Sequence, residues 1–214
     1  MKKLREYLSR PFARRSPPFV ITEPFILASG RSVAEICRRF QLQEEARSFL
    51  REETAPEAFV EQLVRAELCA DAARFLTYAL PKREAVWWAC LCVRCIPACC
   101  GNRIGFRALK SAEVWVRNPR GTSREMALAA GQRHNFEMPT APAAWVAMAA
   151  GWSNGAMPTG QATESPAPQY LTAHAASGAI LLAATVDPDR AAEIYRRFLE
   201  TGVHIAQGKM RIAS

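Results

Sequence analysis

The chain has 214 residues, of which 50% are apolar and 22% are charged, and its formal net charge is +8. This balance is typical of a globular protein with one or two domains, and it excludes an intrinsically disordered chain. The seven cysteines are an odd number and five of them are clustered, which argues against a small secreted disulfide scaffold and favours a reducing compartment.

The N-terminal segment, residues 1–31, is expected to form a basic arm interrupted by prolines. The first 39 residues carry nine Lys or Arg and three Glu, so +6 of the net charge of +8 lies there. Such an arm could contact nucleic acid, anionic lipid or an acidic protein, or it could simply be a solubilising surface. Its candidate binding residues are Arg10, Arg14 and Arg15.

Within this arm, the string FVITEPFIL at residues 19–27 is the only candidate β-strand of the chain. Its internal proline favours an extended arm over a paired strand. Prolines and a glutamate also interrupt the apolar run that a signal peptide requires, although a twin-arginine export signal at Arg14–Arg15 is a minor alternative. No window reaches the roughly 20 uncharged apolar residues of a membrane span. We therefore expect a cytoplasmic protein.

Helical signals fill the remainder of the chain. Capping-box spacing marks helix starts at Ser32–Glu35, Thr54–Glu57 and Thr122–Glu125. The last helix is expected to start at Asp187–Pro188 and to end before a left-handed Gly202. Together with the apolar periodicity, these signals predict helices near residues 32–40, 43–52, 55–67, 70–80, 82–96, 104–117, 122–134, 141–152, 170–185 and 188–201.

These elements predict an all-α fold, with a single compact domain of roughly eight to ten helices over residues 32–214. Alanine is abundant between residues 126 and 192, which favours helix and allows helices to approach closely. The longest break, residues 153–169, is rich in Gly, Pro, Ser and Thr. We expect it to be a loop over this domain, because the helices after it are too few to form a second core.

Five cysteines occur within the string CLCVRCIPACC, at positions 90, 92, 95, 99 and 100. Zinc sites usually combine ligands from two separate chain segments, and no second pair is present. Cys92, Cys95 and Cys99 come nearest to an iron–sulfur rhythm, but Pro97 interrupts the helix that would align them. The preferred interpretation is buried packing residues on an apolar helix, and the alternative is a metal or thiol redox site.

No string indicates catalysis. GWSNG at residues 151–155 matches the G-x-S-x-G nucleophile elbow, but that motif requires a strand before the serine, and an alanine-rich helix precedes it here. Phosphate-binding and dinucleotide-binding glycine motifs are missing from the sequence. We therefore predict a protein that is not an enzyme, with no catalytic residue and no cofactor.

The tryptophans all fall in predicted helices and are expected to anchor the core. The alternative is that one or two of them line a groove that receives a helix or peptide of a partner protein. Trp145 and Trp152 are seven residues apart and would share one helix face. The candidate protein-binding residues are Trp87, Trp88, Trp145 and Trp152.

Three blocks of the chain resemble an uncharacterised bacterial family of all-helical proteins of about this length. They are ALPKREAVWWACLCVR at residues 79–94, PAAWVAMAAGWSNGAMP at 142–158 and YRRFLETGVHIAQGK at 195–209. The resemblance spans about residues 32–209, and the LPKREAVWWACLC block is its most specific part. It implies a genomic setting near type VI secretion genes, beside adaptors that load effectors onto the spike. It implies no catalytic residues.

We therefore expect a non-enzymatic helical accessory protein, an adaptor or chaperone that binds another protein. In the setting that the resemblance implies, the partner would be an effector, the spike or another secretion component. The alternative is a metal- or thiol-dependent redox or sensor protein that uses Cys92, Cys95 and Cys99. Nucleic-acid binding through the arm is the weakest option, and steep salt dependence would reveal it. The sequence carries no signal for an oligomeric state.

Overall fold

The computed structural model describes residues 19–27, 30–137, 141–154, 156–157, 165–166 and 170–212. Within these residues the chain forms ten α-helices, so the prediction of one all-α domain is confirmed. The helices are α2 Val33–Cys37, α3 Glu44–Arg47, α4 Pro56–Arg65, α5 Cys69–Ala79, α6 Lys82–Cys95, α7 Arg103–Arg117, α8 Gly121–Glu137, α9 Pro142–Gly151, α10 Leu171–Ala184 and α11 Ala191–Ala206.

Short elements complete the described secondary structure. Single 3₁₀ turns follow α6 and α9 and precede α11, and they are η1 Pro97–Cys99, η2 Trp152–Asn154 and η3 Pro188–Arg190. Two two-residue strands, β1 Ala156–Met157 and β2 Ser165–Pro166, pair antiparallel within the segment that was predicted to be the long loop. Ser153 and Asn154 of that segment belong to η2, and its remaining residues, like Arg10, Arg14 and Arg15, lie outside the described residues.

The capping box predicted at the start of α2 is confirmed, whereas those predicted at Thr54 and Thr122 are wrong, although α4 and α8 each start within one residue of the predicted bound. Ser32 and Glu35 form the expected capping box, in which the Ser32 hydroxyl accepts from the Glu35 amide and the Glu35 carboxylate accepts from the Ser32 amide. The Thr54 hydroxyl instead accepts from the Arg51 amide, so α4 begins after Ala55 without a side-chain cap. Helix α8 begins at Gly121, one residue before Thr122.

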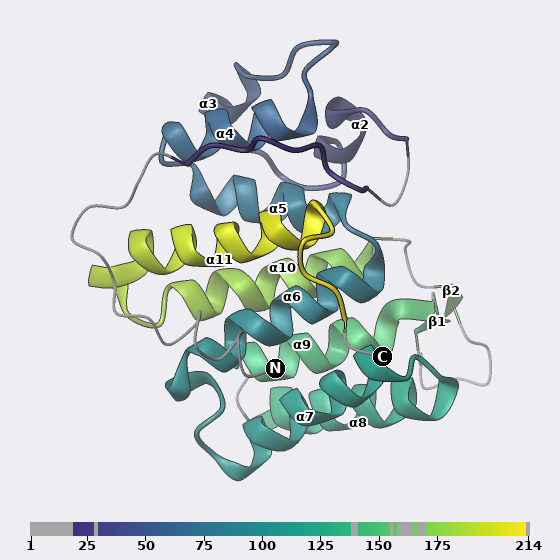
Figure 1. The fold of residues 1–214 in the computed structure, drawn as a ribbon. Helices are drawn as coiled ribbons and strands as arrows, with labels where there is room; N and C mark the ends of the chain where they lie inside the picture. The colour runs from purple at the N-terminus through teal and green to yellow at the C-terminus, as the bar shows by residue number, and fades with distance from the viewer. Residues whose placement is uncertain are drawn as a thin grey trace.

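The helices stack in a fixed order across the molecule. Figure 1 shows α4 at one end, then α5, then α11 and α10, then α6 and α9, with α7 and α8 side by side at the other end. The packing contacts agree, because α4 packs on α5, α11 and α10 pack on α5, and α9 packs on α7, α8 and α10. The ends of the stack therefore offer two well-separated surfaces.

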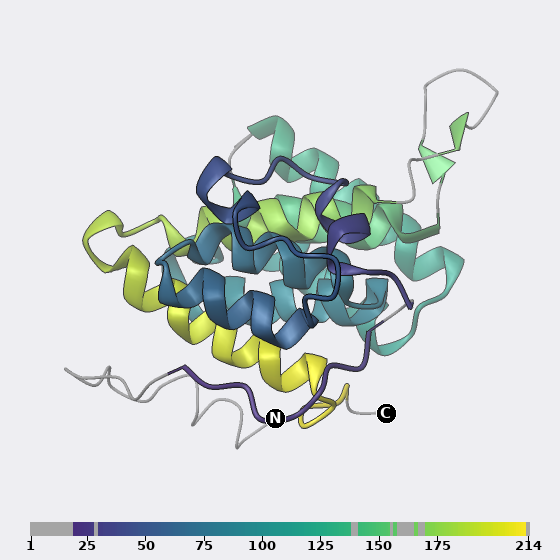
Figure 2. The same cartoon turned by 90° about the horizontal axis from the view of Figure 1, so that it is seen from above.

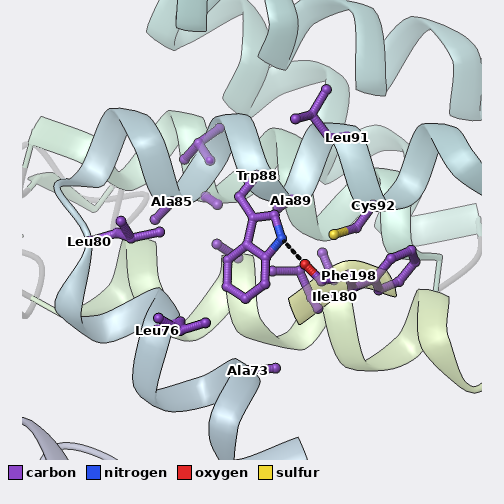
Figure 3. Packing of buried hydrophobic residues seen from close by; sticks show 14 of the residues in the cluster. Ala73, Leu76, Leu80, Ala85, Trp88, Ala89, Leu91, Cys92, Ile180 and Phe198 are labelled. Atoms are coloured by element: carbon purple, nitrogen blue, oxygen red, sulfur yellow. Dashed lines mark hydrogen bonds between the residues drawn. The ribbon is translucent and has the colours of Figure 1, made fainter. Parts of the chain in front are cut away.

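Trp88 joins α6 to α11 at the centre of the stack. Its side chain is 0% exposed, and its indole Nε1 donates a hydrogen bond of 2.9 Å to the carbonyl oxygen of Phe198, as Figure 3 shows. A Cβ atom on Gly202 would lie 2.6 Å from Cζ2 of this indole, which is closer than packed atoms can approach. Because α11 extends to Ala206, Gly202 lies inside this helix and does not terminate it, which corrects the prediction. The left-handed residue that follows α11 is Gly208, with φ of 70°.

The pair α8 and α9 shows the close approach that small residues allow. Every α9 residue except Trp145 is buried, and most of these residues are alanines. A Cβ atom on Gly131 would lie 2.8 Å from the backbone nitrogen of Met148, and one on Gly151 would lie 2.6 Å from Cβ of Leu128. The small residues therefore allow α8 and α9 to approach closely, as the alanine-rich composition predicts.

No helix formed by the described residues combines the length and the apolar character needed to cross a membrane.

Candidate protein-binding site in the groove between α4 and α11

The clustered cysteines lie on α6 and on the η1 turn after it, in the interior of the protein. Cys90, Cys92 and Cys99 are buried and Cys95 is half-buried against the same core. All seven cysteines are free thiols. The described residues, which include every cysteine, contain no group of three or more His, Cys, Asp or Glu side chains placed to hold a metal ion.

Burial also determines the acidity of these thiols. It raises the pKa of the Cys95 thiol to about 11 and that of the Cys99 thiol to about 12, and it raises the pKa of the Cys92 thiol as well. A reactive or metal-binding cysteine needs a lowered pKa, because the thiolate is the nucleophile and the ligand. These side chains are therefore arranged as apolar packing groups.

The structure places the four candidate tryptophans differently. Trp88 is fully buried, so it forms part of the core and offers no surface to a partner. Trp87, Trp145 and Trp152 are half-buried against the same core. The ring of Trp145 lies 6.3 Å from the ring of His174. Ser153, the serine of the G-x-S-x-G string, lies in the η2 turn, and its carbonyl oxygen accepts a hydrogen bond from Lys82 Nζ.

A groove that the sequence did not reveal lies between α4 and α11, and it holds residues 19–27, which we call the arm segment. The arm segment runs extended alongside α11, as Figure 2 shows, and the prediction of an unpaired extended arm is confirmed for these residues. Its side chains alternate with the period of an extended chain. One set packs on the core, and it comprises Phe19, Ile21, Phe25 and Leu27.

The α4 wall of this groove binds the backbone of the arm segment. The amide of Ile21 donates a hydrogen bond to the Glu61 carboxylate, and the amide of Phe25 donates one to the Glu57 carboxylate. Glu57 and Glu61 are one helical turn apart and lie on one face of α4, while Ile21 and Phe25 are four residues apart in an extended chain. Because an ionised carboxylate is the acceptor, each bond is stronger than a neutral one.

The α11 wall contributes the complementary contacts. The Ile26 amide donates a 2.6 Å hydrogen bond to the carbonyl oxygen of Ala206, which is in the last turn of α11. The Gln207 side chain donates to the carbonyl oxygen of Glu23 at 3.1 Å. Gly208 allows the arm segment to lie close to the C-terminal end of α11, because a Cβ atom at this position would lie 2.9 Å from Cδ1 of Ile26.

Charged side chains contact the arm segment at its start and at its middle. Lys209 Nζ lies 3.1 Å from the Glu23 carboxylate, and the Arg196 guanidinium lies 6.0 Å from the centre of the Phe19 ring. A hollow remains open between residues 19–22 and α11, lined on the helix side by Glu200, Val203, His204, Gln207 and Lys209. The arm segment therefore does not fill its groove completely.

Most of the polar contacts in this groove recognise main-chain groups. Carboxylate, carbonyl and amide groups of the walls bind amides and a carbonyl of the arm segment, while shallow apolar contacts take alternate side chains. Sheet edges bind extended peptides on the same principle, with affinity from the main chain and specificity from alternate side chains. The sequence signals for this site are the glutamates at i and i+4 on α4 and the alternation of Phe19, Ile21, Phe25 and Leu27, but no local pattern pairs the two segments.

A family model described as Family of unknown function (DUF6931) matches residues 59–206, which is 148 of the 214 residues. The matched region begins within α4 and ends with α11, so it contains most of the two groove helices and lies C-terminal to the arm segment. No curated protein and no solved structure matches the chain significantly.

Proposed function

The chain belongs to the Family of unknown function (DUF6931), and we propose that it is a non-enzymatic accessory protein that binds an extended apolar segment of another protein in the groove between α4 and α11. The arm segment occupies this groove as an internal ligand. The proposed external ligand has the same chemistry, with bulky apolar side chains at alternate positions and free backbone amides between them.

One observation carries this proposal: two carboxylates on α4 accept hydrogen bonds from backbone amides of the arm segment, at Ile21 and Phe25. Backbone amides are common to every extended peptide, so these acceptors do not depend on the sequence of the arm segment. The outward-facing Val20 and Ile26 are 63% and 64% exposed, so part of the apolar surface of the arm segment remains in solvent. An intramolecular segment held in this way can be replaced by another.

We further propose that the ligand belongs to a bacterial type VI secretion assembly, as an effector, the spike or another secretion component. The support for this setting is the resemblance of the three sequence blocks at residues 79–94, 142–158 and 195–209. In this role the protein would be an adaptor or a chaperone that keeps an extended segment of its partner bound before assembly.

The test uses a fluorescein-labelled peptide with the sequence of residues 18–28 and the full chain carrying Ile21→Asp and Phe25→Asp. These substitutions empty the groove without altering either wall. We expect the labelled peptide to bind this variant with a dissociation constant of about 10–100 μM by fluorescence anisotropy. The wild-type chain should bind at least about tenfold more weakly, because its own arm competes at a millimolar effective concentration.

Methylated peptides provide the matched control. N-methylation at Ile21 and Phe25 removes the two donated amide hydrogens and keeps both side chains, so it should abolish binding. N-methylation at Thr22, whose amide has no hydrogen-bond partner among the described residues, should have a much smaller effect. Equal binding of the two methylated peptides, or no binding of the unmodified peptide to the emptied groove, would refute the proposal.

A further inference from the structure

A second surface lies at the opposite end of the helix stack, on the outer side of α7. Six side chains share one solvent-exposed face of this helix, and we call them the α7 stripe: Arg103, Phe106, Arg107, Lys110, Val114 and Arg117. Their spacing follows the helical period, so they form one continuous row. The opposite side of α7 is buried and includes Ala108, Leu109, Ala112 and Trp115.

The α7 stripe exposes bulky apolar side chains among its cations. Phe106 is 50% exposed and lies between Arg103 and Lys110, and Val114 is 40% exposed and lies between Lys110 and Arg117. On the neighbouring helix α8, Met126 is 65% exposed. A single exposed apolar residue needs no explanation, but a row that combines exposed apolar residues with cations is typical of a binding surface.

The charge of this region is strongly one-sided. Residues 103–133 carry seven Lys or Arg and two Glu, which gives +5, and the acidic side chains are Glu113 and Glu125. Glu113 is already paired with Arg94 and lies 4.0 Å from Lys110. Among the described residues, Arg103, Arg107 and Arg117 form no ion pair with a carboxylate. The α7 stripe thus presents uncompensated positive charge.

We propose that the α7 stripe binds an acidic amphipathic helix of a partner protein. Carboxylates one turn apart on that helix would face Arg103, Arg107, Lys110 and Arg117, and its apolar residues would cover Phe106 and Val114. Charge complementarity of this kind selects the partner and speeds association, while the apolar pair provides the desolvated centre. This inference rests on α7 alone and does not depend on the groove between α4 and α11.

The composition of the α7 stripe favours a protein over the two other anionic partners. A helix that lies in a membrane surface needs a wide apolar face to insert, and the apolar face of α7 is buried in the core. A nucleic-acid surface usually gathers contiguous cations along the phosphate backbone. Here the bulky apolar side chains of Phe106 and Val114 lie among the cations, which suits an amphipathic helix better than a row of phosphates.

The experiment measures binding of three labelled probes to the full chain at low and physiological salt. The probes are a helical peptide with Leu at a and d positions and Glu on both flanks, a 30-base-pair DNA duplex, and vesicles containing anionic phosphatidylglycerol. We expect micromolar binding of the acidic peptide, in the range of about 1–50 μM, and at least about tenfold weaker binding of the other two probes.

Two variants of the α7 stripe separate its charge from its apolar contact. Replacing Arg103, Lys110 and Arg117 by Glu should weaken peptide binding at least about tenfold, and Phe106→Ser should weaken it about threefold or more. The matched control reverses three exposed cations at the other end of the stack, Arg38, Arg51 and Arg65, and it should leave binding within about twofold. All of these side chains are exposed, so none of the variants should disturb folding.

The outcomes are distinct. Loss of peptide binding in the α7 variants but not in the control supports the proposal. Equal losses in both would show non-specific charge attraction and would overturn it. Tighter binding of DNA or vesicles than of the acidic peptide, lost in the same α7 variants, would also overturn it and would assign the stripe to that partner.

Discussion

Helix α11 contacts two very different neighbours along its length. On its inner side, Trp88 of α6 places its whole indole against α11 and donates to the Phe198 carbonyl. On its outer side, the arm segment runs past Val203 and Gln207 and is held through backbone amides. The first contact depends on the shape of one side chain. The second depends on groups that any extended peptide possesses.

This difference separates the contacts that specify the fold from the contact of the arm segment, which a segment of another protein can replace. The α6–α11 contact is buried and tightly packed, and it leaves no space for a side chain at Gly202. The arm contact is half-exposed, leaves a hollow open and is held mainly by a few hydrogen bonds. Segments with few buried contacts open at low free-energy cost, and binding sites are drawn from them.

The largest expected effect is on the inner contact. Trp88→Ala removes a fully buried indole and leaves the Phe198 carbonyl oxygen without its donor, so we expect a loss of about 3–5 kcal/mol in the free energy of unfolding. Urea denaturation followed by circular dichroism measures it. Trp145→Ala, at a half-buried position, should cost clearly less. A loss below about 1 kcal/mol for Trp88→Ala would contradict a rigid α6–α11 contact.

The buried thiols of the core predict that the free energy of unfolding depends on pH. Burial raises the pKa of both Cys37 and Cys99 to about 12, from an ordinary value of 9.0, so unfolding releases protons above pH 9. The contribution of these thiols to stability should therefore be constant below about pH 8, and stability should fall as the pH rises further, by about 1 kcal/mol per buried thiol between pH 9 and pH 10.

Denaturant titrations at several pH values test this dependence. The variant Cys99→Ala should show a shallower alkaline loss than the wild-type chain, whereas Cys100→Ala, at the least enclosed of the clustered thiols, should follow the wild type more closely. A stability that rises above pH 9, or one that is unaffected by Cys99→Ala, would show that these cysteines are not buried as neutral thiols.

Gly202→Ala tests the close contact between α11 and Trp88 by adding a single methyl group. The added Cβ would lie 2.6 Å from the Trp88 indole, so the helices must separate or the indole must move. We expect a loss of about 1–3 kcal/mol despite the better helix propensity of alanine. The matched control is Gly121→Ala, because nothing lies within 4 Å of the added atom there. Equal stability of the two variants would contradict the close contact.

The smallest expected effect on global stability comes from the outer contact. The double variant Glu57→Ala and Glu61→Ala should lower the free energy of unfolding by less than about 1 kcal/mol, and it should correspondingly speed chymotrypsin cleavage at Phe25 about threefold. Glu52→Ala with Glu53→Ala removes the same charge from exposed residues and should leave cleavage unchanged. If cleavage is equally fast in both variants, the α4 carboxylates do not hold the arm segment.

Local sequence signals predicted the helices well and the sites poorly. Apolar periodicity located α6 and α7 within a residue or two of their observed bounds, because both helices bury a clear stripe. The bound of α11 was wrong because Gly202 has the composition of a helix end, and only the tertiary contact with Trp88 explains a glycine inside the helix. A short-range rule cannot anticipate a neighbour more than a hundred residues away.

The candidate sites were missed for a related reason. The tryptophans and cysteines are candidates because of their chemistry. Residue type alone, however, does not show whether a side chain on a helix faces the core or the solvent. Glu57 and Glu61 have no distinctive motif, and their role depends on a segment more than thirty residues earlier. The cations of the α7 stripe follow helical spacing in the sequence. The net charge of +8 does not reveal them, because +6 of it lies in the first 39 residues.

The helices that carry the two proposed surfaces are well separated, because α4 and α11 lie on one side of α6 in the stack and α7 lies on the other, as Figure 1 shows. A protein with one groove for an extended segment and one basic stripe for an acidic helix could hold two partners at once without steric conflict. That arrangement is what an adaptor requires, since it must connect two proteins that do not bind each other directly.

Amide hydrogen exchange in the full-length chain, resolved residue by residue by NMR, tests the central claim most directly. The groove binds through backbone amides, so the amides of Ile21, Phe25 and Ile26 should exchange about tenfold or more slowly than those of Val20 and Thr22. In the Glu57→Ala and Glu61→Ala variant, the protection of Ile21 and Phe25 should disappear. Exchange of all five amides at the rate of an unfolded chain would contradict the account, because the arm segment would not then occupy the groove.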